Sequence, residues 1–493
     1  MAVLRPNSFL CESARLASVL FARVCGERAC DCGFLHVYER ILFAGDGCLR
    51  EPSVPLLGSQ CDIERRENTT VKHVNTHIQH NMAGEDATGV YRAFHTNHGT
   101  GGKADKILKY LPHVADLEMP VKTPVHRAFE QLRQEIDRDG LYETRMSFYA
   151  WLGLWLGALL VTAVYLTVRA TTVLHTVGAA AVFALFLQQC AFVGHDSAHN
   201  GITHHRNVDI MIGMVVGPLL TGISTAWWKR SHNAHHVVTN SVSHDPDIQH
   251  IPFFAVTADL FKRGGVWSHY HRRFFHFDGA AKLLLSYQHL LYYPVMCFAR
   301  WNLYVQGWLL LLDFKTKTDY RAFEILCLFT HYGWLSYVVS CLPSWQLRLL
   351  WLLVSHMIAG ILHVQITISH FSMPTYDGPS LPGVQHGEEF LLQQLHTSMD
   401  LNSGPLNDWF YGGLQWQVVH HVFPRVPRHN LPEVKRRLQA MCKAHGLVYK
   451  SVGWWAGNAE IYRTLHRAAM VARTQRVVNF KDSLLYAGLH AEG

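Results

Sequence analysis

Four long stretches of this chain contain no Asp, Glu, Lys or Arg. They span residues 147–168, 171–193, 325–342 and 349–369, and each has 18 to 23 residues. A helix rises about 1.5 Å per residue, so each is long enough to cross roughly 30 Å of hydrocarbon. A buried helix of that length in a water-soluble protein would carry a polar stripe, which these stretches lack. The sequence therefore predicts an all-α integral membrane protein with four transmembrane helices.

Two further apolar stretches are poorer candidates for crossing a membrane. Residues 210–226 are interrupted by Gly and Pro, and residues 283–312 contain Arg300 among several polar side chains. Such side chains are costly against lipid. We expect both stretches to form in-plane helices or to pack against protein.

Histidine is unusually common, with 34 residues against 37 Asp and Glu, and it forms three groups near the ends of apolar stretches. Their patterns are H-x-x-x-H, H-x-x-H-H and Q-x-x-H-H. Helix positions i, i+3 and i+4 share a face, and His is the commonest metal ligand, so one such group can point at one metal ion. The groups comprise His195, His199, His232, His235, His236, Gln417, His420 and His421.

A shared metal centre also restricts the topology, because all three groups must then face one side of the membrane. Residues 210–226 and 283–312 must stay on that side, which leaves four crossings with both termini beside a His-rich cap. Lys229, Arg230 and the basic run at 435–437 lie on the same side. An excess of Lys and Arg predicts that this side is cytosolic.

The number and type of ligands indicate the metal. A zinc site needs three or four protein ligands, and at least seven His are present here, which favours two ions. The Glu-x-x-His pattern of carboxylate-bridged di-iron proteins does not occur in the sequence. Two irons held mainly by imidazole are therefore predicted, suited to the activation of O₂ against an unactivated C–H bond of a lipid.

Four more residues are candidates for this centre. His370 ends the last apolar stretch and lies on one helical stripe with His356 and His363. A histidine at such a position is usually functional, and we predict that His370 is a ligand. Ligating histidines usually donate their second N–H to a carboxylate or carbonyl. The carboxylates predicted to orient the ligands are Asp196, Asp245 and Asp247.

These motifs resemble the membrane fatty-acyl desaturase family, and within it the front-end branch, which has Gln at the position of Gln417. The resemblance covers about residues 145–475 and is carried by "HDSAH", "WWKRSHNAHH", "TNSVSHDPDI", "YQHLLYYP", "HVQITISHF" and "GGLQWQVVHHVFPRVPRHNL". It implies that the three boxes, with His370 and Gln417 or its neighbourhood, hold two irons. "DPDIQHIPFFA" and "RWNLYV" are most similar to fungal Δ8 sphingolipid desaturases. That likeness implies a ceramide whose long-chain base gains a double bond at C8.

A second resemblance concerns the N-terminal part. Residues 83–95, "AGEDATGVYRAFH", resemble the second half of a cytochrome b5 domain, a small α+β fold, and His95 matches an axial haem ligand. The His-Pro-Gly-Gly turn of that family is replaced by residues 72–75, where His73 is one position off. Haem b needs both imidazoles. Haem binding through His73, loss of haem and an incorrect N-terminal sequence all remain open.

The predicted organisation has five parts, which are an N-terminal region of uncertain type (1–71), a partial cytochrome b5-like segment (72–118), a linker (119–145), a membrane desaturase domain (146–475) and a C-terminal tail (476–493). The resemblance implies a lipid substrate, O₂, and electrons from cytochrome b5 and its NAD(P)H-dependent reductase. It also implies the endoplasmic reticulum membrane, with the active site facing the cytosol. The net charge of +7 is mild and the basic residues form no long runs, so no nucleic-acid partner is expected.

Other functions fit parts of the pattern. Front-end desaturases of polyunsaturated acyl chains share most of these motifs, and lipid hydroxylases use similar His boxes. "HDSAH" also resembles the H-E-x-x-H site of an intramembrane zinc protease with Asp as the base, although that function leaves the other two boxes idle. A metal or haem carrier without catalytic activity is the remaining alternative.

Overall fold

The computed structural model describes residues 87–95, 122–384, 388–404 and 406–477, and most of them are helical. The chain forms two compact units, residues 1–123 with 385–389 and residues 124–384 with 390–493. In the first unit, helix α5 (Thr88–Phe94) ends at His95, whose ring stacks on Tyr91 with 4.5 Å between centroids. His73 and the remainder of the predicted cytochrome b5-like segment lie outside the described residues.

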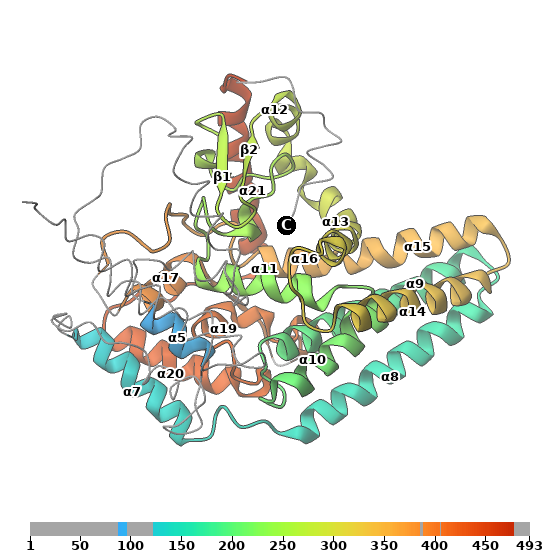
Figure 1. The fold of residues 1–493 in the computed structure, drawn as a ribbon, viewed down its shortest axis with the longest axis horizontal. Helices are drawn as coiled ribbons and strands as arrows, with labels where there is room; N and C mark the ends of the chain where they lie inside the picture. Colours follow the sequence, from blue (N-terminus) through green and yellow to red (C-terminus); the bar gives the residue numbers. More distant parts are fainter. Residues whose placement is uncertain (1–86, 96–121, 385–387, 405, 478–493) are drawn as a thin grey trace, which may run out of the picture. The chain divides into compact units, whose positions relative to one another are not determined.

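The second unit contains four apolar helices that are long enough to cross a membrane, as the sequence predicted. They are α8 (Met146–Arg169), α9 (Val173–Ala198), α14 (Arg321–Ser340) and the pair α15 (Trp345–Ala359) and α16 (Ile361–Thr367). Figure 1 shows the long helices side by side as a bundle, in which α9 packs against both α8 and α15. Phe183 and Trp351 fill the centre, with ring centroids 4.8 Å apart. The bundle therefore holds its helices together through apolar packing.

The fourth span is broken at Gly360, whereas the sequence predicted one continuous helix over 349–369. A Cβ atom at Gly360 would lie 2.6 Å from the carbonyl oxygen of Met296 and 2.9 Å from the Cα of Cys297. Both neighbours belong to helix α13 (Gln288–Leu312). The backbone of α13 therefore crosses the span at a glycine, because a side chain at this position would collide with it.

Replacing Gly360 by valine is expected to force these two backbones apart. Overpacking of this kind costs about 1–3 kcal/mol, so the thermal unfolding temperature of the detergent-solubilised protein should fall. Gly333 in α14 is a matched control, since a Cβ there meets nothing within 4 Å. An equal fall for Gly333→Val would show that the close crossing is not the cause.

The two stretches predicted not to cross are not among the four candidate spans. Residues 206–219 form α10 (Arg206–Met214) and a π-helical turn η1 (Val215–Leu219), and the chain then turns at Gly222 with φ +73°. Helix α12 (Gly279–Ser286) precedes α13, in which polar side chains are buried against protein. Both stretches contact the helices that carry histidines of the boxes, α10 against α9 and α13 against α11 (Thr225–Val237).

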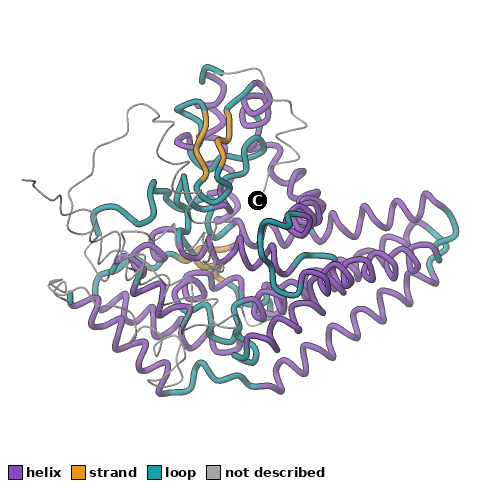
Figure 2. Tube along the Cα trace, viewed as in Figure 1, coloured by secondary structure: helices purple, strands orange, loops and turns teal. Residues whose placement is uncertain are grey.

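The remaining elements build a cap, which contains most histidines of the three boxes. Helix α7 (Pro124–Arg138), within the range predicted as a linker, packs against α20 (Leu431–Ala444). Strands β1 (Gly265–Ser268) and β2 (Arg273–His276) pair antiparallel, and β3 (Asp400–Asn402) pairs in parallel with β4 (Ser451–Gly453). Figure 2 shows these strands as short orange segments in a helical fold. The other cap elements are α11 (Thr225–Val237), η2 (Pro246–Ile248), η3 (Ala258–Leu260), α17 (Glu389–Thr397), α18 (Asp408–Tyr411), η4 (Leu414–Trp416), α19 (Gln417–Val422), η5 (Arg428–Asn430) and α21 (Trp454–Thr474).

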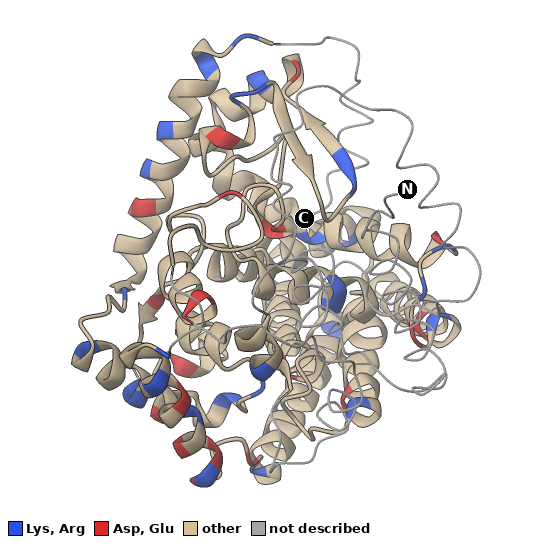
Figure 3. Cartoon of the chain, turned by 60° about the vertical axis from the view of Figure 1, so that its left-hand side comes forward, with Lys and Arg blue, Asp and Glu red and all other residues tan. Residues whose placement is uncertain are grey.

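Charged residues are sparse on most of this ribbon, as Figure 3 shows. The ion pairs gather on the cap instead. Glu433 pairs with Arg436 and Arg437 along α20, and Arg437 also pairs with Asp139 just after α7. These contacts tie α7 to α20 at the surface of the cap.

Candidate metal centre

Eight histidines from four separate segments converge in the structure. They come from the end of α9, from α11, from the short segment just after α16, and from α19. Within each of two groups, the potential ligand atoms lie within 4.8 Å of one another. The first group is His195, His199, His232, His236 and His420, and the second is His235, His370 and His421.

The three histidines of α11 are divided between these groups. Nε2 of His236 lies 3.0 Å from Nε2 of His232, whereas the ring of His235 lies 4.7 Å from that of His370 and 5.0 Å from that of His421. Neighbouring helix residues point about 100° apart, and the ligand atoms of His235 and His236 fall in different groups, although the ring of His421 lies 4.0 Å from that of His236. The spacing alone suggested that all three histidines of this box bind one ion. In the structure, His232 and His236 belong to one group and His235 to the other.

The side chains of both groups are largely buried, which sets their protonation. Burial, followed by repulsion from neighbouring rings, lowers the pKa of six imidazoles well below the usual value, in His199, His232, His236, His370, His420 and His421. Neutral imidazole is the form that binds a metal. These six residues are therefore in the ligating form at neutral pH.

His235 differs because a carboxylate holds its second nitrogen. Burial by itself would lower its pKa, but attraction from Asp245 and Asp247 raises it to about 9. Nδ1 of His235 lies 2.9 Å from Asp245, whose carboxylate also accepts hydrogen bonds from the backbone N–H groups of Asn240 and Asp247. This arrangement directs Nε2 of His235 toward His370 and His421.

The other two predicted carboxylates have different contacts. A carboxylate oxygen of Asp247 lies 3.8 Å from Nδ1 of His235, and the side chain accepts a hydrogen bond from Ser231. Asp196 lies 3.7 Å from Nδ1 of His195, but its hydrogen bonds come from Tyr149 at 2.8 Å and Arg428 at 2.5 Å. Asp196 thus joins the histidine-bearing end of α9 to α8 and to the segment after α19.

The donor set fits two metal ions. Nδ1 of His421 lies 3.0 Å from Oε1 of Gln394, whereas its Nε2 is buried and finds no hydrogen-bond partner among the described residues. Oε1 of Gln417 is buried and likewise has no partner in that part of the chain. Buried polar atoms are rarely left in this state unless an ion, water or ligand engages them.

The N-terminus of α11 is held in place by Glu324 of α14, a residue that the sequence analysis did not identify as a candidate. Ser224 caps the helix by accepting a hydrogen bond from the N–H of Trp227. Glu324 of α14 accepts hydrogen bonds from the Ser224 hydroxyl at 2.8 Å and the Ala226 N–H at 3.2 Å. A carboxylate at a helix N-terminus is favourable, and here it fixes α11 to a membrane helix. The signal in the sequence was a lone acidic residue at the start of an apolar stretch.

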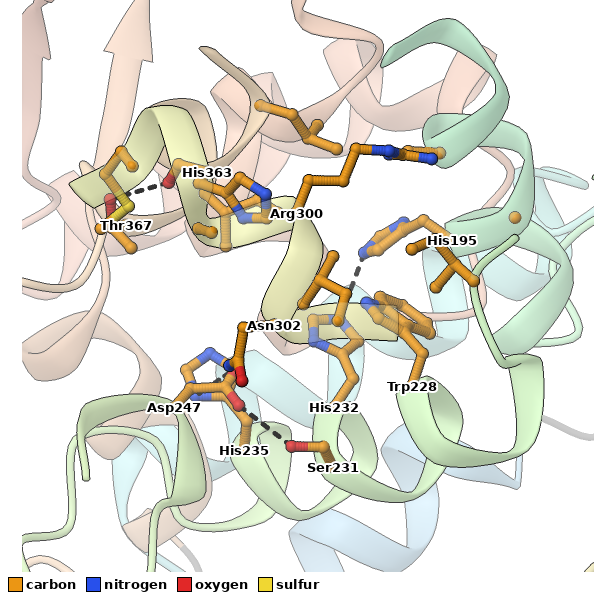
Figure 4. A pocket seen from close by; sticks show the side chains of 18 of the residues that line it. His195, Trp228, Ser231, His232, His235, Asp247, Arg300, Asn302, His363 and Thr367 are labelled. Carbon is orange, nitrogen blue, oxygen red and sulfur yellow. Dashed lines mark hydrogen bonds and ion pairs between the residues drawn. The ribbon is translucent and has the colours of Figure 1, made fainter. Parts of the chain in front are cut away.

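A mostly apolar cavity of about 620 Å³ lies beside both groups. Its wall includes His195, His232, His235 and His370 together with apolar side chains of α9, α11, α13 and α16. Figure 4 shows His195, His232, His235 and Trp228 around the hollow, with Arg300 and His363 along another edge. The cavity has the size of a site for one lipid chain.

Comparison with known proteins agrees with this geometry. Residues 171–453 match the sequence profile described as "Fatty acid desaturase". This chain belongs to the fatty acid desaturase family. It is 37% identical to the Δ8-fatty-acid desaturase 2 of Arabidopsis thaliana over 84% of this chain and 89% of that protein. It is also 37% identical to the Δ8-(E)-sphingolipid desaturases of Kluyveromyces lactis, over 75% of this chain and 64% of that protein, and of Emericella nidulans, over 73% and 65%.

This desaturase is therefore a membrane oxidoreductase that acts on lipid, as the His boxes predicted. Family membership supports this function over the zinc protease and over a carrier without catalytic activity. All predicted histidines of the three boxes, with His370, lie in the two groups, and Gln417 lines the cavity beside them.

Proposed function

We propose that this desaturase inserts a C=C bond at C8 of the long-chain base of a ceramide, using two irons held by the two histidine groups. The observation that carries the proposal is the position of both groups on the wall of an apolar cavity. The printed functions of the fungal relatives support the substrate and the position of the bond.

The metal pair would supply the activation of O₂ that removal of hydrogen from a methylene group requires. Overall, two adjacent CH₂ groups each lose one hydrogen, and O₂ with two electrons and two protons becomes two waters. The role of the chain is to hold the alkyl segment against the histidine wall and to exclude bulk water. Phe254, Phe371 and Trp227, which are buried and line the cavity, serve that exclusion.

The electrons would come from cytochrome b5 and its NAD(P)H-dependent reductase. If His73 and His95 together hold haem b, the segment 72–118 is that donor, and otherwise a separate cytochrome b5 supplies them. We place the protein in the endoplasmic reticulum membrane with the metal centre facing the cytosol. Lys and Arg on the metal side of the four spans support this orientation.

Expression in a yeast strain that makes no Δ8 sphingoid bases tests the proposal. Mass spectrometry of the hydrolysed sphingolipids is expected to find long-chain bases unsaturated at C8. A His236→Ala variant expressed to the same level serves as the inactive control. New polyunsaturated acyl chains or hydroxylated bases in place of Δ8 bases would overturn the assignment in favour of an acyl desaturase or a hydroxylase.

A further inference from the structure

Arg300 of α13 is a buried cation in the wall of this apolar cavity. It is 2% exposed. Its Nη2 donates to the carbonyl of Thr221 at 2.7 Å, and its Nε donates to the hydroxyl of Tyr304 at 2.9 Å. Within the described ranges, no carboxylate lies within 4.0 Å of the guanidinium and no hydrogen bond engages Nη1. Burial of a charge without a counter-charge is costly, so the site favours a ligand that accepts hydrogen bonds.

The surroundings hold this guanidinium in one place. The Tyr304 hydroxyl lies 3.1 Å from Nε2 of His356, and the ring of His356 stacks on Trp301 at 5.0 Å. Gly222, next to Thr221, packs so closely that a Cβ there would lie 3.0 Å from the Tyr304 ring. A fixed donor loses little conformational entropy when a ligand binds, which suits it to recognition.

Arg300 bonds to the segment just before α11, whereas the histidines of that helix lie toward its end. Thr221 lies just before this helix, and His232 stands seven residues after its first residue, Thr225, a rise of about 10 Å. With carbon–carbon bonds of about 1.5 Å, a zigzag chain covers that rise in roughly eight bonds. In a ceramide, the C1 hydroxyl oxygen lies about eight bonds from C8, and the C3 hydroxyl oxygen lies about six bonds from it. Figure 4 shows Arg300 across the hollow from His232 and His235.

We propose that Arg300 binds the amide or hydroxyl oxygens of the long-chain base and thereby sets which carbon reaches the metal centre. This inference rests on the proposed function. Nη1 makes no hydrogen bond within the described ranges, and Arg300 lines the cavity, so this nitrogen is available to those oxygens. A charge-assisted hydrogen bond from a fixed guanidinium makes Arg300 a specificity-determining residue for the position of the double bond.

The test is Arg300→Met, with ceramide as the supplied substrate and the full-length, iron-loaded enzyme. We expect kcat/KM to fall at least about tenfold, mainly through KM, which is the size of one charged hydrogen bond. Double bonds should also appear at carbons other than C8, with iron content and unfolding temperature unchanged. Arg348→Met is the control, because Arg348 donates to the backbone carbonyls of Leu342 and Ser340 but does not line the cavity.

Other outcomes would overturn the inference. If Arg300→Met makes Δ8 bases as efficiently as the wild type, or loses iron or stability while its product stays at C8, Arg300 is structural. Should this variant fail to fold, Arg300→Gln and Tyr304→Phe are expected to show the same scatter of product to a smaller degree, and product at C8 alone refutes the role. If the variant instead moves a bond within acyl chains, the bound oxygen is an ester carbonyl. Absence of Δ8 bases from the wild type would contradict the proposed function itself.

Discussion

Substituting His370 by alanine is expected to abolish desaturation and to lower the iron content of the purified protein from about two to about one per chain. His370 belongs to the group of three, which would keep only two imidazoles. The other group shares none of its ligands and keeps all five. Iron analysis of the detergent-purified protein, with product analysis from the same cells, measures both effects.

His244→Ala is the matched control for this substitution. His244 is buried like His370, with 8% against 3% exposed, but it stacks on His269 at 4.1 Å and belongs to neither group. This variant should retain its iron. Unchanged turnover in His370→Ala, or loss of both irons at once, would contradict the division of the histidines into two independent groups.

Asp245→Asn is expected to lower activity and iron affinity by about 10- to 100-fold, the usual effect of losing a carboxylate that orients a ligand. The Asp245 carboxylate contacts Nδ1 of His235 at 2.9 Å and 3.1 Å and is 0% exposed. Asparagine keeps the volume but removes the charge. The ring of His235 then loses its fixed orientation toward His370 and His421. Iron titration of the metal-free protein measures the change in affinity.

Asp247→Asn provides the comparison, because it alters a second carboxylate near the same nitrogen. Asp247 is 3.8 Å away and accepts a hydrogen bond from Ser231 instead, so the loss of affinity and activity in Asp247→Asn should be several-fold smaller. A loss for Asp247→Asn as large as that for Asp245→Asn would argue against a specific orienting role of Asp245.

Much of the membrane architecture was predictable because composition decides it. The apolar stretch 147–168 differs from α8 by one residue at each end. The start of α14 was placed four residues late, since Arg321 and Glu324 appeared too polar for a span. Their charges are accommodated by partners distant in sequence, with Glu324 at the start of α11 and Arg321 bonded to the carbonyl of Leu311. Such compensation cannot be seen in a local window.

The site was predictable as a set of residue types but not as a geometry. The three boxes and His370 follow from spacing, because imidazoles near the ends of spans have few other uses. Which histidines share a group depends on how α11 is rotated relative to α9 and α19, and the break at Gly360 depends on the approach of α13. In the sequence, Arg300 indicated only that residues 283–312 are too polar to face lipid. The structure places Arg300 in the wall of the cavity.

Each histidine group includes one member of α19, His420 in the first and His421 in the second. During synthesis, all four spans are already made before the ribosome reaches this helix, since α16 ends at Thr367. Neither ion can then have its full set of ligands while the chain is still being inserted. On the proposed di-iron centre, iron acquisition is a late step of biogenesis, and a nonsense mutation before α19 would leave a membrane-embedded product unable to complete either metal site.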